Sequence, residues 1–255
     1  MNYHNFELFE QFVKNDFKLR YKNSFLGLLW VILKPMAMFA ISYVVWSNIF
    51  GVDPLFKQYL LLGLIIMMFF SELMMMGLSS LMSRAYIILK VNFKREIAIY
   101  SATFIAVIDL LVNLFIFFIF SLNSSAVTSP IGIGLFILSM FTLYILCMGV
   151  TLFLAIWFIK LRDLQNIVEL GIQLLYWGTP IFYPLSIIPE RYRSFIQYNP
   201  LTIVVSAARE GLIYGNKVTN GSFTQILILL LISVTIFILG RIFFKKNVTK
   251  IAEFF

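Results

Sequence analysis

Residues 110–159 read LLVNLFIFFIFSLNSSAVTSPIGIGLFILSMFTLYILCMGVTLFLAIWFI, and none of these 50 residues is Asp, Glu, Lys or Arg. An uncharged run of this length is too long for the core of a soluble domain. One bilayer crossing needs roughly 20 apolar residues. The run therefore predicts two crossings, joined by the polar, turn-like stretch Ser121–Pro130.

The composition of the whole chain is typical of a polytopic membrane protein. Hydrophobic residues make up 61% of the 255 residues and charged residues only 13%. We therefore expect residues 1–255 to form a single transmembrane domain without a separate soluble part. The net charge of +8 is interpreted as cytoplasmic loops that face anionic lipid, not as a surface for nucleic acid.

The residue types that most catalytic sites need are scarce in this sequence. The single cysteine, Cys147, excludes an intrachain disulfide, and the single histidine, His4, excludes a histidine-based metal site or catalytic triad. No G-x-x-x-x-G-K-[ST] motif occurs, so the chain does not bind ATP through a P-loop. No cofactor or metal is expected in this chain.

Hydropathy predicts an all-α integral membrane fold with six transmembrane helices. The expected spans are residues 26–50, 58–82, 97–122, 131–159, 166–182 and 223–243. With a cytoplasmic N-terminus, the inner segments carry fourteen basic residues and the outer segments five. The positive-inside rule therefore places both termini in the cytoplasm.

Two segments outside the spans are expected at the cytoplasmic side. Residues 84–95 form a short basic loop with an apolar centre, which favours docking of a cytoplasmic partner. Residues 5–22 predict an amphipathic helix in the membrane interface. Its apolar residues recur at spacings of three and four with charges between them: Phe6, Phe9, Val13 and Phe17.

Residues 183–215 break the pattern of spans. The segment contains three prolines, and its uncharged stretch between Arg193 and Arg209 is 15 residues long. A helix of that length covers about 22 Å, less than the roughly 30 Å hydrocarbon core. The expected form is a pair of short re-entrant helices in the outer leaflet. Irregular backbone at that depth is tolerated only inside protein or beside water, which indicates a segment that lines a path.

Ionisable residues inside the expected spans are few: Lys34, Glu72, Asp109 and Glu169. Charges at that depth are costly and usually face a cavity or the interior of the bundle. Glu72 and Asp109 are therefore candidates for lining a channel, with a structural pair between helices as the alternative. Lys34 is long enough to reach toward the cytoplasm, and Glu169 is expected at the interface.

One face of the first expected span is aromatic, with Phe39, Tyr43, Trp46 and Phe50 at spacings of four, three and four. Aromatic faces stack on sugar rings, so Phe39, Tyr43 and Trp46 are candidates for lining a glycan channel. Packing within the bundle, together with an interfacial aromatic belt, is the alternative and the better-supported interpretation.

Several motifs resemble those of polysaccharide ABC-exporter permeases, the subunits that export O-antigen, capsule or teichoic acid. Asp16–Trp30, followed by Lys34-Pro35, is similar to the start of their first span. Leu161–Val168 looks like their cytoplasmic Arg-Asp turn, with Arg162 and Asp163. Their outer gate is similar to Thr179–Pro184, Ile188–Glu190, Tyr198–Leu201 and Arg209. The loop at 84–95 departs from the family, because Lys94 replaces a proline and the leading Asn is missing.

The resemblance implies partners and a location. Such permeases form homodimers, and each copy docks one separate ATPase subunit, which binds ATP and Mg²⁺. A lipid-linked glycan, with O-antigen on a polyprenyl pyrophosphate as the first choice, would enter from the inner leaflet of the bacterial inner membrane. It would then move through a channel between the two copies, with membrane lipids as further partners. Arg20, Lys22 and Lys34 would attract the lipid pyrophosphate.

The resemblance also implies roles for two other groups of residues. The docking loop would receive the force of ATP-driven closure through Tyr86, Ile87, Leu89, Lys90 and Arg95. The outer gate would contain Pro180, Tyr183, Pro184, Pro189, Asn199, Pro200 and Arg209.

Three alternatives remain open on the sequence. A type-2 ABC exporter of small drugs or lipids shares the architecture, and co-transcription with glycosyltransferase genes would argue against it. A membrane-embedded enzyme of envelope synthesis would have to use Glu72 and Asp109 for its chemistry. A proton-coupled flippase would transport without ATP.

Overall fold

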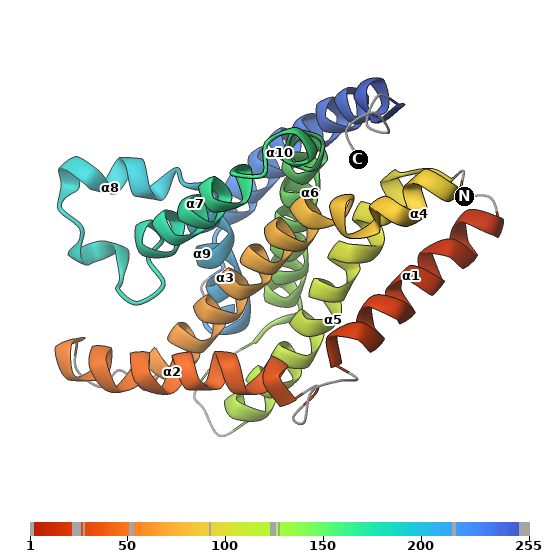
Figure 1. Ribbon diagram of the computed structural model, residues 1–255. Coiled ribbons are helices and arrows are strands. Elements are labelled where there is room, and N and C mark those ends of the chain that lie inside the picture. The colour runs from red at the N-terminus through yellow and green to blue at the C-terminus, as the bar shows by residue number, and fades with distance from the viewer. Residues whose placement is uncertain are drawn as a thin grey trace.

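The computed structural model describes residues 3–21, 27, 29–50, 54–91, 93–122, 126, 128–215 and 218–249. These residues are almost entirely helical (Figure 1). The order of elements is α1 (Tyr3–Tyr21), α2 (Leu29–Phe50), α3 (Phe56–Ser79), the short 3₁₀ helix η1 (Met82–Arg84), α4 (Ala85–Lys90), α5 (Glu96–Ser121), α6 (Pro130–Lys160), α7 (Leu164–Gly178), η2 (Leu185–Ile187), α8 (Glu190–Gln197), α9 (Pro200–Leu212) and α10 (Asn220–Asn247).

Five of the described helices are long and apolar enough to cross a membrane: α2, α3, α5, α6 and α10. The uncharged run forms two of them, as predicted, because α5 ends at Ser121 and α6 begins at Pro130. The start of α6 follows from local chemistry. Ser129 caps the helix by accepting a hydrogen bond from the Gly132 amide at 3.0 Å, and proline suits the first helical position because it has no N–H to satisfy.

The fifth expected span is shorter in the structure than in the sequence-based expectation. Helix α7 has 15 residues and ends at Gly178, four residues before Phe182. A helix of that length covers about 22 Å, less than a hydrocarbon core. The cause is Pro180, since the residue before a proline avoids helical geometry. Thr179 accordingly adopts an extended conformation, with φ −102° and ψ 137°.

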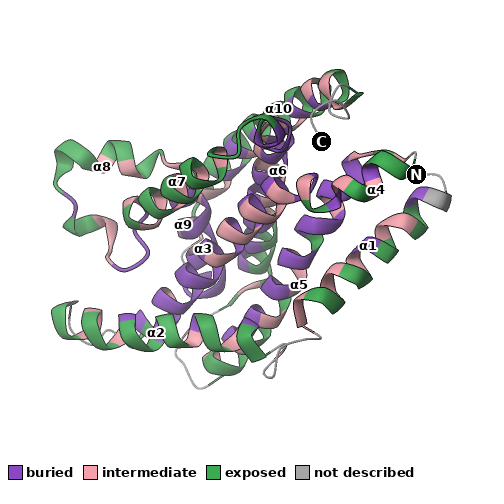
Figure 2. Ribbon diagram, viewed as in Figure 1, coloured by how far each residue is buried: buried purple, intermediate pink, exposed green. Residues whose placement is uncertain are grey.

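Helix α3 runs through the centre of the molecule (Figure 1), and 72% of its most apolar stretch is buried. Figure 2 shows buried residues gathered along α3 and α9, whereas α2, α7 and α8 are largely exposed. The core cluster unites α3, α5, α6 and α9, with Leu61, Ile66, Leu143 and Val204 fully or almost fully buried in it. A helix that is apolar all round belongs in such a position.

Glycines allow α6 to pack closely against α9 and α10. A Cβ atom added at Gly132 of α6 would lie 2.3 Å from the carbonyl oxygen of Gly211 in α9. A Cβ atom added at Gly240 of α10 would lie 2.5 Å from the carbonyl oxygen of Gly149 in α6. Small residues allow helix backbones to approach in this way within membranes. The Gly132 contact fixes α9, which carries one of the two arginine clusters described below.

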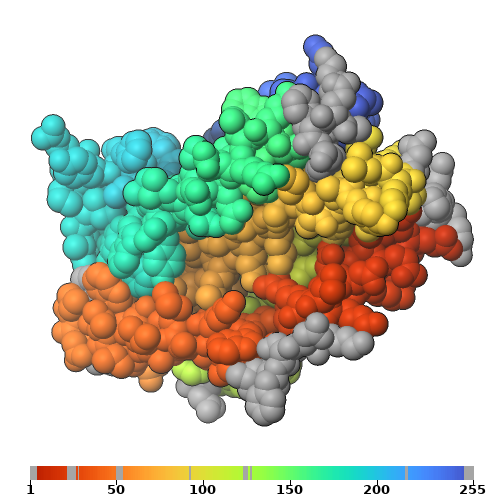
Figure 3. Space-filling view, viewed as in Figure 1, coloured from red at the N-terminus to blue at the C-terminus, as the bar shows by residue number. Residues whose placement is uncertain are grey.

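Helix α1 covers residues 3–21 and packs against α5. It lies at the edge of the molecule (Figures 1 and 3). The Phe9 ring contacts the Phe104 ring of α5 at 5.6 Å, edge to face. Phe12, which lies outside the predicted apolar stripe, is buried, while Phe6 within that stripe is exposed. The amphipathic pattern thus predicted the helix, but the face toward the protein is rotated from the one expected.

Candidate functional site

Arg20, in the last turn of α1, forms the centre of a charged cluster. Its guanidinium makes ion pairs with Glu72 of α3 at 2.7 Å and with Asp109 of α5 at 2.8 Å. Tyr21 donates a hydrogen bond to the second carboxylate oxygen of Asp109 at 2.7 Å. We call Arg20, Tyr21, Glu72 and Asp109 the Arg20 cluster. It unites three helices that are far apart in the sequence.

The burial of the Arg20 cluster explains its composition. The Asp109 side chain is only 4% exposed, whereas those of Arg20 and Glu72 are about one-third exposed. A buried carboxylate needs a counter-ion and hydrogen bonds. Burial disfavours the charge of Arg20, but Glu72 and Asp109 outweigh this effect and raise the pKa of Arg20. Burial, helped by the hydrogen bond to Asp109, also raises the pKa of Tyr21, so the cluster keeps one firmly held cation.

Sequence reasoning had placed these residues in separate roles. Glu72 and Asp109 were expected as channel residues or as a structural pair, and Arg20 as a cation for lipid pyrophosphate. The structure brings all three together, with Arg20 between the two carboxylates. Whether Glu72 and Asp109 line a channel stays a prediction.

A cavity of about 610 Å³ lies beside the Arg20 cluster. Its walls come from the end of α1 and from α2, α3, α5 and α7. Lys34 of α2 lines it, as does the exposed indole of Trp30. Lys22, the third expected uptake residue, lies outside the described residues. The polar residues in the wall are Arg20, Tyr21, Lys34, Ser71, Glu72, Asn113 and Tyr176.

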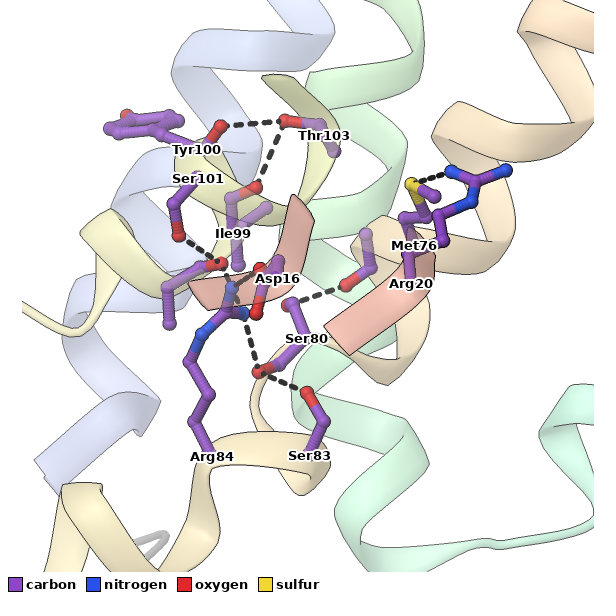
Figure 4. Close-up of polar contacts among 12 residues, drawn as sticks. Asp16, Arg20, Met76, Ser80, Ser83, Arg84, Ile99, Tyr100, Ser101 and Thr103 are labelled. Carbon is purple, nitrogen blue, oxygen red and sulfur yellow. Dashed lines mark hydrogen bonds and ion pairs between the residues drawn. The ribbon is translucent and has the colours of Figure 1, made fainter. Parts of the chain in front are cut away.

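A second arginine, the buried Arg84, joins α1 to the segment before α4. Its guanidinium donates hydrogen bonds to the carbonyl oxygens of Ser80 at 3.2 Å and Ala98 at 2.8 Å, and it forms an ion pair with Asp16 of α1 (Figure 4). It also lies over the Phe12 ring, at 5.0 Å from the centroid. Burial lowers the pKa of Arg84, which Asp16 partly opposes. Burial raises the pKa of Asp16 and Arg84 opposes this.

No sequence pattern predicts the role of Arg84. It stands at the edge of a basic loop, and such residues are usually solvated. Only the fold shows that η1 turns its side chain inward. Figure 4 also shows Arg20 near the sulfur of Met76, and the contact measures 3.9 Å. Asp16, the partner of Arg84, lies one turn before Arg20 in α1. Helix α1 is therefore attached to the bundle at two points that are one turn apart.

The predicted docking loop contains the short helix α4. Ile88 is buried and anchors it, while Tyr86 and Leu89 are exposed and Ile87 is half-buried. Lys90 lies over the Tyr86 ring at 3.9 Å. Arg95 donates a hydrogen bond to the carbonyl of Val248, just beyond α10. The residues expected to bind an ATPase subunit thus form a small apolar surface with a basic margin, and its role stays a prediction.

The segment expected to form an outer gate is built around Arg209 of α9. The guanidinium donates hydrogen bonds to three carbonyl oxygens, those of Tyr59 at 3.1 Å, Pro180 at 2.7 Å and Ile181 at 2.9 Å. It also stacks on the Tyr59 ring at 3.3 Å. We call Arg209, Tyr59, Pro180 and Ile181 the Arg209 cluster. Arg209 is only 3% exposed, although the sequence analysis assigned it to the basic residues of the outer segments.

The other expected gate residues shape the turns around this cluster. Tyr183 donates a hydrogen bond to the carbonyl of Trp177 at 2.9 Å. Asn199 caps α9 by accepting from the Leu201 amide at 3.1 Å, and Pro200 is the first helical residue. Pro184 and Pro189 precede η2 and α8. Two short helices, α8 and α9, are therefore present as predicted, while their depth in a membrane stays a prediction.

The aromatic face of α2 contacts other rings of the chain. Phe39 is buried between Tyr43, at 5.8 Å, and Phe120, at 5.5 Å. Trp46 stacks on Phe182 at 5.7 Å. These contacts favour the packing interpretation for Phe39 and Trp46. The side chain of Phe50 lies outside the described residues.

The remaining expected site is the turn between α6 and α7. Arg162 and Asp163 are both exposed there. The Arg162 carbonyl accepts a hydrogen bond from Gln165 at 3.3 Å, and the Asp163 carbonyl accepts one from Ile167 at 3.2 Å. Within the described part of the chain, no group of three or more His, Cys, Asp or Glu side chains is placed to hold a metal ion.

Comparison with known proteins identifies a family and several relatives. The profile of the ABC-2 type transporter family matches residues 7–213. The O-antigen export system permease protein RfbA of Klebsiella pneumoniae is 29% identical over 252 residues, which is 97% of this chain and 95% of the relative. RfbA of Myxococcus xanthus is 26% identical and covers 76% of each chain. The polysialic acid transport protein KpsM of Escherichia coli is 26% identical over 78% of this chain and 79% of its own length.

Proposed function

Since the chain belongs to the ABC-2 type transporter family, we propose that it is the membrane subunit of an ATP-driven exporter of lipid-linked polysaccharide. The similarity to an O-antigen export permease over 97% of the chain carries this assignment. O-antigen on a polyprenyl pyrophosphate is the proposed cargo. A capsule polymer is the second candidate, because KpsM is named for polysialic acid transport.

The proposed topology has six crossings, with α7 as the fifth. Helix α7 is too short to span a bilayer alone, so the turn at 179–184 and the Arg209 cluster would complete the crossing. Six crossings place both termini on one side, and the excess of basic residues in the inner loops assigns that side to the cytoplasm. The host membrane is then the bacterial inner membrane.

The surface of α7 supports a channel between two copies of the chain. Asn166, Glu169 and Gln173 are exposed at spacings of three and four along the helix. Glu169 accepts a hydrogen bond from Gln165 at 2.9 Å, but no other helix covers this polar face in the described structure. Polar side chains at bilayer depth avoid lipid and face water or protein. A second copy would enclose this face, and water would fill the space between.

The proposed ATPase subunit binds on α4. Tyr86 and Leu89 are exposed apolar side chains at the inner end of the bundle, and Lys90 and Arg95 supply charge around them. Arg84, directly before α4, is hydrogen-bonded to α5 and ion-paired to α1. Movement of α4 on ATP binding would therefore shift α1 and, through it, the Arg20 cluster.

Deletion of the gene in its own host tests the function. We expect a polyprenyl-linked polymer to accumulate inside the cell while the same polymer disappears from the surface. Wild-type complementation should restore export, and Leu89→Asp should not, although the protein is still inserted. Leu122→Asp changes an exposed apolar residue at the end of α5 opposite to α4 and serves as the control. A normal surface polymer and an unchanged lipid-linked pool after deletion would contradict the assignment.

A further inference from the structure

The cavity beside the Arg20 cluster contains two buried polar atoms that lack a hydrogen-bond partner. They are the side-chain oxygen of Asn113 and the hydroxyl oxygen of Tyr176. Asn113 is 8% exposed, and its amide nitrogen donates to the Asp109 carbonyl at 2.9 Å, which fixes the orientation of its oxygen. Buried polar atoms in folded proteins nearly always have partners. Two such atoms in one cavity provide hydrogen-bonding positions that a ligand with hydroxyl groups can occupy.

The charges around the cavity are unevenly distributed. Arg20 lies between Glu72 and Asp109, so one cation is matched by two carboxylates. Lys34, by contrast, takes part in none of the ion pairs found among the described residues. The cavity therefore has a cationic margin at Lys34 and an interior that disfavours anions. Arg20, which the sequence suggested for phosphate binding, is already occupied.

The remaining wall is suited to a sugar ring. The Trp30 indole lines the cavity and is exposed, and aromatic faces stack well on flat, partly apolar ligands. Glu72 and Asn113 supply acceptors, and Tyr176 supplies a donor or acceptor. The volume of about 610 Å³ lies within the range of small-molecule sites, about 300–1,000 Å³.

We propose that this cavity binds the first sugar of the lipid-linked glycan, that this sugar is uncharged, and that Asn113 and Tyr176 recognise its hydroxyl groups. The assignment rests on the proposed function and adds the residues that recognise the cargo. Lys34 binds the adjoining lipid phosphate. Arg20 acts as a positioning residue, because it holds Glu72 and closes the wall at α1.

A binding experiment with two lipids tests this assignment. The full-length chain, co-purified with its ATPase subunit, is placed in lipid nanodiscs. Dissociation constants are measured for undecaprenyl pyrophosphate and for undecaprenyl pyrophosphate that carries one N-acetylhexosamine. The variants are Asn113→Ala, Tyr176→Phe and Lys34→Ala. Tyr192→Phe, on the exposed surface of α8, is the control. Tyr176→Phe removes only a hydroxyl group and keeps the ring, so it still tests the cavity if Asn113→Ala does not fold.

We expect the sugar to strengthen binding to the wild-type protein. Asn113→Ala and Tyr176→Phe should each weaken binding of the sugar-bearing lipid about five- to tenfold and leave binding of the sugar-free lipid unchanged. Lys34→Ala should weaken both lipids to the same degree. Equal losses for both lipids in Tyr176→Phe, or no loss for either, would overturn the sugar assignment. A wild-type protein that binds neither lipid would overturn the proposed function as well.

Discussion

The Arg20 and Arg209 clusters place a guanidinium in two different surroundings. Arg20 is held by two carboxylates and remains about one-third exposed beside a cavity. Arg209 is held by three backbone carbonyls and one aromatic ring and is almost completely buried. In the Arg20 cluster, two carboxylates compensate the positive charge of the guanidinium. In the Arg209 cluster, the carbonyl oxygens accept its hydrogen bonds but carry no opposite charge. The ion pairs of Arg20 can therefore separate without leaving backbone groups unpaired. The hydrogen bonds of Arg209, by contrast, hold the backbone at Pro180 and Ile181 in place.

Arg209→Met is expected to give the largest loss of stability. Three carbonyl oxygens would lose a charged donor, and hydrogen bonds to charged groups contribute about 1.5–3 kcal/mol each. We expect the free energy of unfolding to fall by about 4 kcal/mol or more, with little folded protein in detergent extracts measured by fluorescence size-exclusion chromatography. Arg209→Lys should not rescue, because a single ammonium cannot reproduce the planar geometry of the guanidinium.

Arg191→Ala is the control for Arg209, because Arg191 is exposed on α8. It should leave the elution profile unchanged. A stable Arg209→Met variant would show that water replaces the guanidinium as donor to the three carbonyls. The proposed difference between the two clusters would then be wrong.

Arg20→Met is expected to have the second-largest effect. Breaking a buried ion pair costs about 3–5 kcal/mol, and partial exposure of Arg20 reduces this to about 2–3 kcal/mol through solvent screening. Thermal unfolding should therefore begin at a lower temperature. The loss arises from the two carboxylates left without a cation, so Glu72→Gln combined with Asp109→Asn should restore much of it.

This rescue separates the two clusters. No second substitution can remove the carbonyl groups that face Arg209, so no comparable rescue is available there. If the triple variant is as unstable as Arg20→Met alone, charge compensation is not the function of the Arg20 cluster.

Asp16→Asn is expected to have a small effect on stability. Arg84 combines features of both clusters, because it binds two carbonyls and one carboxylate. Burial raises the pKa of Asp16 despite Arg84, so the fold favours the protonated form relative to the unfolded chain. This contribution is present at low pH and decreases as pH rises through the pKa of the folded state. A neutral Asn should therefore change the free energy of unfolding by about 1 kcal/mol or less.

The pH dependence provides the check on Asp16. Unfolding curves recorded from pH 4 upward should lose part of their pH dependence in Asp16→Asn. If Asp16→Asn lowers the free energy of unfolding as much as Arg20→Met does, Arg84 depends on its carboxylate partner in the same way as Arg20.

Lys34→Ala is expected to change stability least, within about 0.5 kcal/mol, because Lys34 is exposed and outside the ion pairs described. Its effect should instead appear in lipid binding. Thermal unfolding of the empty protein measures the first part. A clear loss of stability would show that Lys34, like Arg20, belongs to the framework.

The sequence predicted the helices of this protein more accurately than their contacts. The uncharged run fixed the end of α5 and the start of α6 within a residue or two, because burial in lipid demands apolar length. The prolines correctly indicated two short helices after Tyr183. The end of α7 was misjudged by four residues, since hydropathy continued through Phe182 although Pro180 had already ended the helix.

The candidate site was only partly predictable. Glu72 and Asp109 were identified because charges inside spans are rare, and their exceptional cost in lipid is visible in any sequence. The role of Arg20 in phosphate binding stays a prediction, and its ion pairs with both carboxylates were not foreseen, because nothing in a sequence reports which charge faces which. Asn113 and Tyr176 were missed, since an amide and a phenol within spans are common. Their missing hydrogen bonds appear only when neighbouring helices are in place.

The sequence by itself determined that this chain is a membrane protein, which segments are helical and which family it resembles. Each of these follows from apolar length, from prolines or from motifs that are local in the chain. Only the tertiary structure decided that Arg20 is ion-paired with two carboxylates, that Arg209 is buried and that two polar atoms without partners share a cavity with Lys34. Those facts depend on contacts between residues up to 150 positions apart, and such contacts are set by packing geometry, which hydropathy does not encode.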